Sequence, residues 1–430
     1  MTLKSDLCKN DIAWNLLFGK YHIIDQVDRY GFFEISATQI NEFREARLMT
    51  KFDHRASLPD LFSKNDLAIL PVTRGTYVIS RIEAYKVFEQ STDEVESANI
   101  PDYIQSIDYE NITSEAMAIN CAYVSEILAD FLEDEALLPT VSGRMSSASF
   151  SFIIWNKQMK SDFSINVVNS QVEIDGGYEG IRRIALIEAK NYFSDDFLIR
   201  QLYYPYRLWT GKVQKQVIPI FLVYSNGVFS LYEYQFSDPE RYNSLTLVKQ
   251  KNYSIEAADI SLEEIVRLLN GVQVAQEPEV SFPQANDFKR IINLCELLLQ
   301  SDMIMDEITQ NYAFDRRQTN YYTDAGRYLG LISKNRFNGE ITFSLTDEGR
   351  RIIRLPYKSR QLKFVEKILE HRAFNETLKL YLKYAQAPPR QEVIQVMHAS
   401  DLYQVEADST FGRRASTIIS WINWILHLQK

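Results

Sequence analysis

The sequence predicts an α/β protein whose central part is a mixed sheet flanked by helices. Short apolar runs of strand character alternate with helical periodicity between residues 96 and 272, which indicates this sheet. Two strand-like runs within residues 67–80, beside a helical stretch, predict an amino-terminal α/β module. From residue 287 onward a helical period prevails and predicts helical modules. At 430 residues the chain is long enough for several domains of ordinary size.

Composition and periodicity suggest four parts and one linker. We expect an amino-terminal module in residues 1–95, the central α/β domain in residues 96–272, and two further modules in residues 287–355 and 356–430. Residues 273–286 are polar, contain two prolines and show no period, so they are predicted to be the linker.

Several function classes are disfavoured. Cys8, Cys121 and Cys295 are scattered and odd in number, and no CxxC or Cys/His cluster occurs, which argues against disulfides and structural zinc. The sequence holds no signal-peptide core and no run of 18 apolar residues, so we expect a cytoplasmic protein without a membrane partner. Neither a phosphate-binding Gly-rich loop nor a Gly-x-Ser-x-Gly elbow is present, so no nucleotide cofactor is expected.

The net charge of −10 is unevenly distributed along the chain. The first 285 residues hold 40 acidic and 26 basic residues, whereas basic residues outnumber acidic ones 21 to 17 in the remainder. A net-acidic protein binds nucleic acid through a local basic face, because local charge makes the contacts.

The clearest chemical signal is Asp175, followed by twelve residues and then Glu188-Ala189-Lys190. Each acidic residue ends an apolar-alternating run, and we expect the two runs to pair as a hairpin across the glycines at 176–177. Because side chains alternate in direction along a strand, Glu188 and Lys190 would share one face, and Asp175 can join them there.

These residue types suit a Mg²⁺ site. The two carboxylates and the backbone carbonyl of Ala189 would bind a hard cation that prefers oxygen ligands and retains water. Such a cation lowers the pKa of bound water and stabilises charge on a phosphate, and Lys190 would orient that water or stabilise the transition state. The alternative is a chance triplet, because short motifs carry a high false-positive risk. The upstream Asp175 and the cost of placing charge at the end of a buried strand favour the chemical interpretation.

With these residues in place, the motif resembles the signature of the PD-(D/E)XK nucleases, with Ile174 instead of proline. The predicted helix at residues 195–209, which carries Arg200, Gln201 and Tyr204, and the strands at 217–225 and 228–236 follow the order of elements in that superfamily. The similarity, strongest to type II restriction endonucleases, covers residues 100–255. It implies Mg²⁺-dependent hydrolysis of phosphodiester bonds, with Gln201 positioning the substrate or the active-site face.

A helix predicted over residues 112–134 opens this domain, with Ala116, Ile119, Tyr123, Ile127 and Phe131 on its apolar face. The resemblance makes Glu115, at its start, a further metal ligand, with Glu126 less favoured. An acid in the first turn is also explained by the helix dipole alone. Arg144, in a polar loop near the motif, is expected to hold a phosphate.

The amino-terminal module has a basic stretch in which Arg44, Arg47, Lys51 and Arg55 fall at helical spacing. These residues are expected to contact DNA, or equally to form a solvated basic helix. His54, within the same stretch, is expected at the surface. Two strands are predicted on either side of a turn at residues 73–75.

Residues 287–355 are predicted to form a winged helix with three helices and a wing hairpin at Asn338-Gly339. A recognition helix presents basic and amide side chains near its amino end, although winged helices also contact proteins. The DNA-binding candidates here are Arg316, Arg317, Gln318, Thr319, Asn320 and Tyr322.

Residues 356–430 are predicted to hold a second helical, winged-helix-like unit. Arg413 and Arg414 stand at the start of its last helix, ahead of an apolar stripe of Ile418, Trp421, Ile422 and Ile425 that is expected in the core. The arginines are DNA-binding candidates, or they belong to a capped, solvated helix end.

Together these patterns predict a sequence-specific endonuclease that cuts double-stranded DNA with Mg²⁺, as the type II enzymes of restriction-modification systems do. A homodimer is one way to cut both strands. Two alternatives stay open: a non-catalytic winged-helix DNA-binding regulator on an inert nuclease-like core, and a structure-selective repair nuclease. The recognition sequence and the cleavage position stay open as well.

Overall fold

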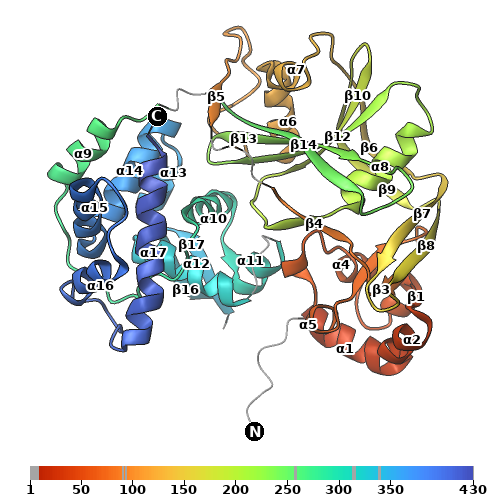
Figure 1. Cartoon of the computed structure of the whole chain (residues 1–430), viewed down its shortest axis with the longest axis horizontal. Helices are drawn as coiled ribbons and strands as arrows, with labels where there is room; N and C mark the ends of the chain where they lie inside the picture. Colours follow the sequence, from red (N-terminus) through yellow and green to blue (C-terminus); the bar gives the residue numbers. More distant parts are fainter. Residues whose placement is uncertain are drawn as a thin grey trace. The chain divides into compact units, whose positions relative to one another are not determined.

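The computed structural model describes residues 9–89, 92, 94–255, 259–311, 316–337 and 340–429 (Figure 1). It is a mixed α/β protein that divides into two compact units. Unit 1 consists of Met1–Glu94, Ser114–Tyr224 and Phe229–Asn252, and unit 2 of Val95–Thr113, Ser225–Val228 and Tyr253–Lys430. No helix in the described ranges is long and apolar enough to cross a membrane.

A seven-stranded mixed sheet forms the centre of the fold, with strand order β5-β14-β13-β12-β10-β9-β6. β10 lies inside it, parallel to β12 and antiparallel to β9. The strands are β5 (Val95–Ser97), β6 (Leu138–Ser146), β9 (Gln171–Glu179), β10 (Arg183–Lys190), β12 (Gln216–Ser225), β13 (Val228–Phe236) and β14 (Leu245–Ser254). Every residue of β10 after Arg183 is buried, as expected for a strand covered on both faces.

Helix α8 (Arg200–Thr210) connects β10 to the parallel strand β12 and packs on β9 and β10. The helix begins five residues later than the sequence predicts, because residues 196–198 form β11 (Asp196–Leu198), which pairs with β4 (Tyr85–Val87). The predicted strands at 217–225 and 228–236 are confirmed as β12 and β13.

The expected hairpin forms, but its turn lies elsewhere. Gly176 and Gly177 are inside β9, opposite Ile187 and Leu186, and the chain turns at residues 180–182. The glycines allow close packing instead: an added Cβ would lie 3.1 Å from the Ile119 side chain at Gly176, and 2.7 Å from the Val141 side chain at Gly177.

The helix predicted over residues 112–134 is two helices, α6 (Glu115–Val124) and α7 (Ile127–Leu132). Glu126 between them is left-handed, with φ 61°, which ends the first helix. Ala116, expected on the apolar side, is exposed, whereas Ile119, Ile127 and Phe131 are buried as predicted.

The amino-terminal part of unit 1 packs helices around a small sheet of order β1-β3-β2. The two predicted strands are confirmed as β2 and β3, which pair antiparallel. Its elements are α1 (Lys9–Tyr21), α2 (Ile23–Tyr30), β1 (Phe32–Ser36), α3 (Ala37–Ile40), α4 (Ala46–Met49), η1 (Arg55–Ser57), α5 (Asp60–Lys64), β2 (Ala68–Pro71) and β3 (Thr76–Ser80). A separate pair, β7 (Ser149–Asn156) and β8 (Ser161–Val168), is antiparallel.

The basic stretch is not one helix. α4 is a single turn, and the chain from Thr50 to His54 is irregular before η1 begins. Arg44, Arg47, Lys51 and Arg55 therefore do not form one helical face, which corrects the expectation from their spacing. His54 is buried, not at the surface.

Residues 288–353 of unit 2 form helices and a small antiparallel sheet of order β15-β17-β16. The predicted wing turn, Asn338-Gly339, lies outside the described residues, but the strands on either side of it pair as expected. The elements are α10 (Phe288–Gln300), β15 (Met303–Ile304), α11 (Met305–Asn311), α12 (Arg316–Tyr328), β16 (Ile332–Phe337), β17 (Glu340–Leu345) and α13 (Asp347–Ile353).

The remainder of unit 2 is helical. It contains α9 (Leu262–Gly271), α14 (Tyr357–Leu369), α15 (Arg372–Tyr384), α16 (Arg390–His398) and α17 (Asp408–His427). The stripe on α17 is fully buried, as predicted. Residues 273–286 are irregular, as a linker would be, yet they pack on the helices: the Trp421 indole donates to the Ala285 carbonyl at 2.7 Å.

Candidate active site

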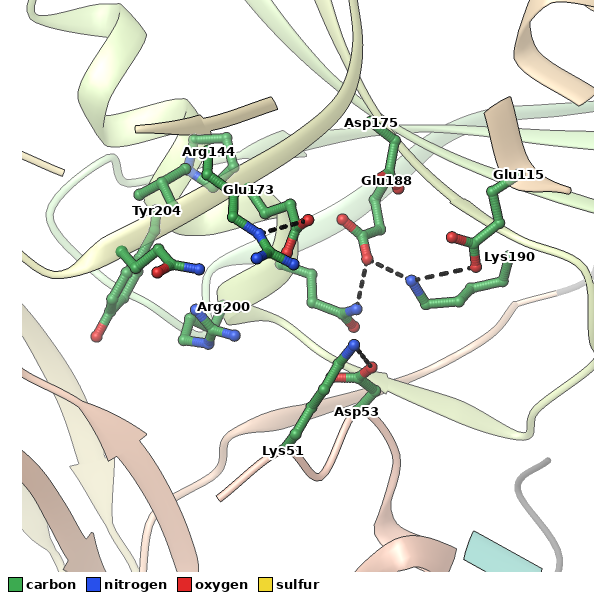
Figure 2. A pocket seen from close by; sticks show the side chains of 14 residues that line it. Lys51, Asp53, Glu115, Arg144, Glu173, Asp175, Glu188, Lys190, Arg200 and Tyr204 are labelled. Carbon is green, nitrogen blue, oxygen red and sulfur yellow. Dashed lines mark hydrogen bonds and ion pairs between the residues drawn. The ribbon is translucent and has the colours of Figure 1, made fainter. Parts of the chain in front are cut away.

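A cavity of about 170 Å³ in unit 1 brings the sequence motif together (Figure 2). Its lining is mostly polar and comes from six stretches of the sequence. These residues are Lys51, Asp53, Glu115, Arg144, Gln171, Val172, Glu173, Asp175, Glu188, Lys190, Arg200, Gln201, Tyr204 and Pro205.

Asp175 lies where the pairing of β9 and β10 ends. The last paired residues are Gly176 and Ile187, and the same register continued by one position places Asp175 opposite Glu188. There the backbone N–H of Ala189 donates to Oδ2 of Asp175 at 2.9 Å, in place of a main-chain partner. The two carboxylates of the motif are thus neighbours across the strands, as the sequence predicts.

Glu188 is held by two donors on a single oxygen. The Lys190 amine and the Gln201 side-chain amide both donate to Oε1 of Glu188 at 2.6 Å. Lys190 also donates to the Ala189 carbonyl at 3.1 Å and lies 3.7 Å from Oε1 of Glu115. Gln201 reaches Glu188 because α8 begins directly beside the motif, so the sequence-predicted catalytic residues meet in one place.

Each carboxylate retains an oxygen for a ligand. Among the described residues, Oε2 of Glu188 and Oδ1 of Asp175 accept no hydrogen bond, since the bonds described above all involve the other oxygen of each group. The side-chain oxygen of Gln201 is buried and also has no partner. A buried polar atom without a partner is costly, so the Gln201 oxygen indicates a site that is completed by a bound group, and the two carboxylate oxygens are free to bind a cation there.

When no cation is bound, burial and mutual proximity disfavour the charged forms of the acidic side chains in the cavity. Burial raises the pKa of the Glu188 carboxyl to about 7, and Asp175 adds to this rise while Lys190 opposes it. Burial lowers the pKa of the Lys190 amine, but Glu188, Tyr192 and other acidic neighbours outweigh it, so this pKa lies well above its ordinary value. Lys190 is therefore charged, and a further cation would relieve the crowding of carboxylates.

Glu115 belongs to the cavity, whereas Glu126 does not line it. Ser114 caps α6 by accepting a hydrogen bond from the Met117 N–H, which leaves Glu115 in the first turn but directed towards Lys190. Burial raises the pKa of the Glu115 carboxyl, opposed by Lys190. The helix dipole alone does not account for this placement.

Three further side chains bound the cavity. Arg144 lies opposite Glu173 on the neighbouring strand, and its Nε donates to that carboxylate at 3.0 Å. Arg200 lies over the ring of Tyr204, and its buried Nε has no hydrogen-bond partner. The Tyr204 hydroxyl donates to the Pro71 carbonyl, so the ring is fixed.

Asp53 lines the cavity although the sequence was not interpreted that way, and Lys51 lies beside it. The two side chains come from the irregular stretch after α4, with Lys51 Nζ 3.9 Å from Asp53 Oδ2. No periodicity signals such a loop, and only the local clustering of charge in "KFDHR" marked it. Arg44 and Arg47, the other candidates in this stretch, do not line the cavity.

The predicted recognition-helix residues do not all face outward. Arg317 and Asn320 are exposed, and the Arg317 guanidinium donates to the Tyr321 hydroxyl at 2.5 Å. Gln318 is half-buried, and the side chain of Arg316 lies outside the described residues. Thr319 and Tyr322 are buried, since the helical period turns them towards the core, and this corrects the expectation that they contact DNA.

The arginine pair at the carboxy-terminal end is also placed differently. α17 begins at Asp408, so Arg413 and Arg414 lie inside the helix and not at its start. Arg413 is exposed, while Arg414 is half-buried and near Tyr321 and Asp324 of α12. Burial lowers the pKa of Arg414, and Arg413 adds to this effect.

The described part of the chain has no group of three or more His, Cys, Asp or Glu side chains arranged to hold a metal ion. Any cation in the cavity would therefore depend on two carboxylates, a backbone carbonyl and water. Cys121 and Cys295 are buried free thiols, in keeping with the absence of zinc motifs from the sequence.

Three family models match the chain, and each describes a domain of unknown function. DUF6996 matches residues 11–79, DUF6997 matches residues 80–254 and DUF7226 matches residues 290–430. No curated protein and no solved structure matches the chain. The cavity residues from Glu115 to Pro205 lie in the second matched segment, whereas Lys51 and Asp53 lie in the first, so the cavity draws on two of the three.

Proposed function

We propose that the protein is a Mg²⁺-dependent, sequence-specific endonuclease that cuts double-stranded DNA, similar to type II restriction enzymes. One observation carries the proposal: Asp175 and Glu188 lie side by side beside Lys190, at the point where the pairing of β9 with β10 ends, and each carboxylate has an oxygen without a partner in a polar cavity. Oxygen donors of this kind suit Mg²⁺.

The donor set fits such a cation. Asp175 and Glu188 would hold it with the Ala189 carbonyl, and Glu115 would bind through water. Bound there, the cation would supply charge stabilisation on the phosphate and a more acidic water. Only two carboxylates are needed, because Mg²⁺ commonly retains several waters.

Side chains of the cavity would position the attacking water and the phosphates. Lys190, charged and bonded to Glu188, would place its amine beside the attacking water and offset charge on the phosphate. Gln201 holds Glu188 by its amide N–H, and its side-chain oxygen is buried without a partner. Arg144 and Arg200, at the edge of the cavity, would contact phosphates on either side of the bond that is cut.

The finer fold assignment rests on topology. Antiparallel β9–β10 followed by α8 and parallel β12 is the order expected of a PD-(D/E)XK nuclease core. In unit 2, the succession α10, β15, α11, α12, β16 and β17 with a three-stranded sheet supports the winged-helix assignment. Arg317, Asn320 and Arg413 are its exposed candidates for DNA contact. Two active sites in a homodimer would cut both strands.

A second candidate is a DNA-binding regulator on an inert nuclease-like core. It is favoured by two observations. Lys190 and Gln201 already donate hydrogen bonds to Glu188, and the described residues contain no group of three side chains arranged to hold a metal ion. This candidate predicts DNA binding without cleavage. A structure-selective nuclease, in contrast, would cut branched DNA and spare linear duplexes.

Supercoiled plasmid incubated with the full chain and Mg²⁺ separates these functions. We expect linear products from the parent and none from Asp175→Ala. A gel shift of the same plasmid fragments without any cutting would support the regulator, and cutting confined to branched substrates would support the structure-selective nuclease. Cutting by Asp175→Ala at the parental rate would show that the site is wrong.

A further inference from the structure

The irregular stretch between α4 and η1, residues 50–54, forms one wall of the candidate active site. Figure 2 shows the Lys51 amine and the Asp53 carboxylate directed towards the space beside Glu188. This stretch belongs to the segment matched by DUF6996, while the carboxylates of the motif belong to the DUF6997 segment. The cavity is therefore incomplete without the amino-terminal part of the chain.

The stretch is anchored to the segment that carries Lys190 and Gln201. The Leu198 N–H donates to the Asp53 carbonyl at 2.7 Å, and the Arg55 N–H donates to the Asp196 carboxylate at 2.9 Å. The Tyr85 hydroxyl adds a bond to the Phe52 carbonyl at 3.0 Å. These bonds fix the backbone of the stretch beside β11, two residues before α8 begins.

A second anchor lies nearer to the catalytic lysine. The ring of His54, which is buried, meets that of Tyr192 edge to face at 6.0 Å. Tyr192 follows Lys190 by two residues, so the stretch is held at both ends of the segment that crosses the site. These contacts therefore fix the position of residues 50–54 beside the cavity.

Lys51 is the basic side chain of this wall with the weakest interactions with the rest of the protein. Its amine makes no hydrogen bond among the described residues and lies 3.9 Å from Asp53. The Lys51 side chain is 69% exposed, whereas that of Asp53 is 15% exposed. A long, solvated lysine tethered above a half-buried carboxylate can close on an incoming anion without breaking a hydrogen bond.

We propose that Lys51 contacts a phosphate of the DNA strand being cut and that Asp53 positions its amine. The inference rests on the proposed function, because it names part of the substrate contact of the same site. It assigns the amino-terminal segment a role in the catalytic step, beyond general attraction of DNA. Arg47, on the neighbouring turn but outside the cavity, has no such role.

Lys64 provides a matched control. It is 69% exposed, like Lys51, and pairs with one aspartate, Asp60, at 2.7 Å in the same part of the chain. Lys64 does not line the cavity. Replacement of either lysine by alanine removes one exposed positive charge, so their difference reports on position alone.

The test uses the full chain and a labelled duplex that contains a cut site mapped with the parent protein. Single-turnover cleavage with excess protein gives the maximal rate and the half-saturating concentration, and anisotropy with Ca²⁺ in place of Mg²⁺ gives duplex affinity. For Lys51→Ala we expect a maximal rate about 100-fold lower, with affinity changed less than about threefold, as for a group that acts in the transition state. Lys51→Arg should recover most of the rate, and Asp53→Asn should lower it about tenfold.

Lys64→Ala should leave both quantities unchanged. If Lys51→Ala behaves like Lys64→Ala, or weakens affinity while the saturated rate is unchanged, the assignment of Lys51 to the catalytic step is overturned and the proposed function stands. If the parent cuts no DNA under any of these conditions, the proposed function fails and this inference falls with it. Melting curves for each variant establish that the protein is folded.

Discussion

The backbone N–H of Ala189 donates a 2.9 Å hydrogen bond to Oδ2 of Asp175. The bond lies one position beyond the last main-chain pair of β9 and β10, between Gly176 and Ile187. One carboxylate oxygen of Asp175 thus accepts a hydrogen bond where the pairing of β9 and β10 ends, and the other oxygen remains for the cavity. Asp175 therefore stabilises the pairing of the two strands and is also a proposed metal ligand, and different substitutions can test these two roles separately.

Comparison of Asp175→Asn with Asp175→Ala should distinguish the structural role of Asp175 from its proposed role in cleavage. Asparagine keeps an oxygen that accepts from the Ala189 N–H, whereas alanine loses it and leaves a donor unsatisfied. We expect Asp175→Ala to lose about 1 kcal/mol of unfolding free energy relative to Asp175→Asn, and both to lose cleavage. Urea titration in the absence of Mg²⁺ measures the first quantity. Equal stabilities would show that the hydrogen bond contributes nothing.

Lys190 and Glu188 form a buried pair whose partners depend on each other. Lys190→Met leaves the Glu188 carboxylate buried beside Asp175, and loss of one partner of such a pair costs about 3 kcal/mol. The double variant Glu188→Gln with Lys190→Met should recover part of that loss, because no lone charge remains. Lys212→Met, at an exposed position, is the control and should change stability little. Additive effects in this double-mutant cycle would contradict the coupling.

Mg²⁺ should stabilise the parent protein without any DNA. Binding to the folded state alone adds about 1.4 kcal/mol when Mg²⁺ exceeds its dissociation constant tenfold. Asp175→Asn should abolish the corresponding rise in melting temperature, and EDTA should reverse it in the parent. A melting temperature that is the same with and without Mg²⁺, or that rises equally in Asp175→Asn, would place the cation elsewhere.

The exposed arginines of unit 2 should contribute to DNA affinity through phosphate contacts. Arg317→Ala and Arg413→Ala are each expected to weaken duplex binding and to reduce the slope of log affinity against log salt by about one. Lys383→Ala, an exposed position on α15, is the charge-matched control and should leave the slope as it is. Equal effects at all three positions would mean that net charge alone governs binding.

Much of the site was predictable from sequence because it rests on local spacing. Glu188 and Lys190 stand at the end of β10, which is marked by where the apolar run stops, whereas Asp175 lies in the middle of β9. Strands β16 and β17 of unit 2 and the buried stripe of α17 have equally clear periods. Each of these patterns spans fewer than about twenty residues, within which one period dominates.

The errors have physical causes that are not local. Gly176 and Gly177 resemble a turn in sequence, but they are required where α6 and β6 approach β9 closely. The apparent helix through Lys51 is broken because the stretch after α4 is bound to β11, which is more than 140 residues away in sequence. Tertiary contacts of this kind override local spacing, and they bring Asp53 into the cavity although no periodicity in the sequence indicates it.

The most direct measurement is to incubate the full chain with mapped phage DNA and Mg²⁺ and to sequence the ends that form. A sequence-specific endonuclease should produce double-strand ends at every copy of one short sequence, and Asp175→Asn and Lys190→Met should produce none. DNA left intact by the parent, ends at unrelated sequences, or the same ends from Asp175→Asn would contradict the assignment of Asp175, Glu188 and Lys190 as a Mg²⁺-dependent nuclease site.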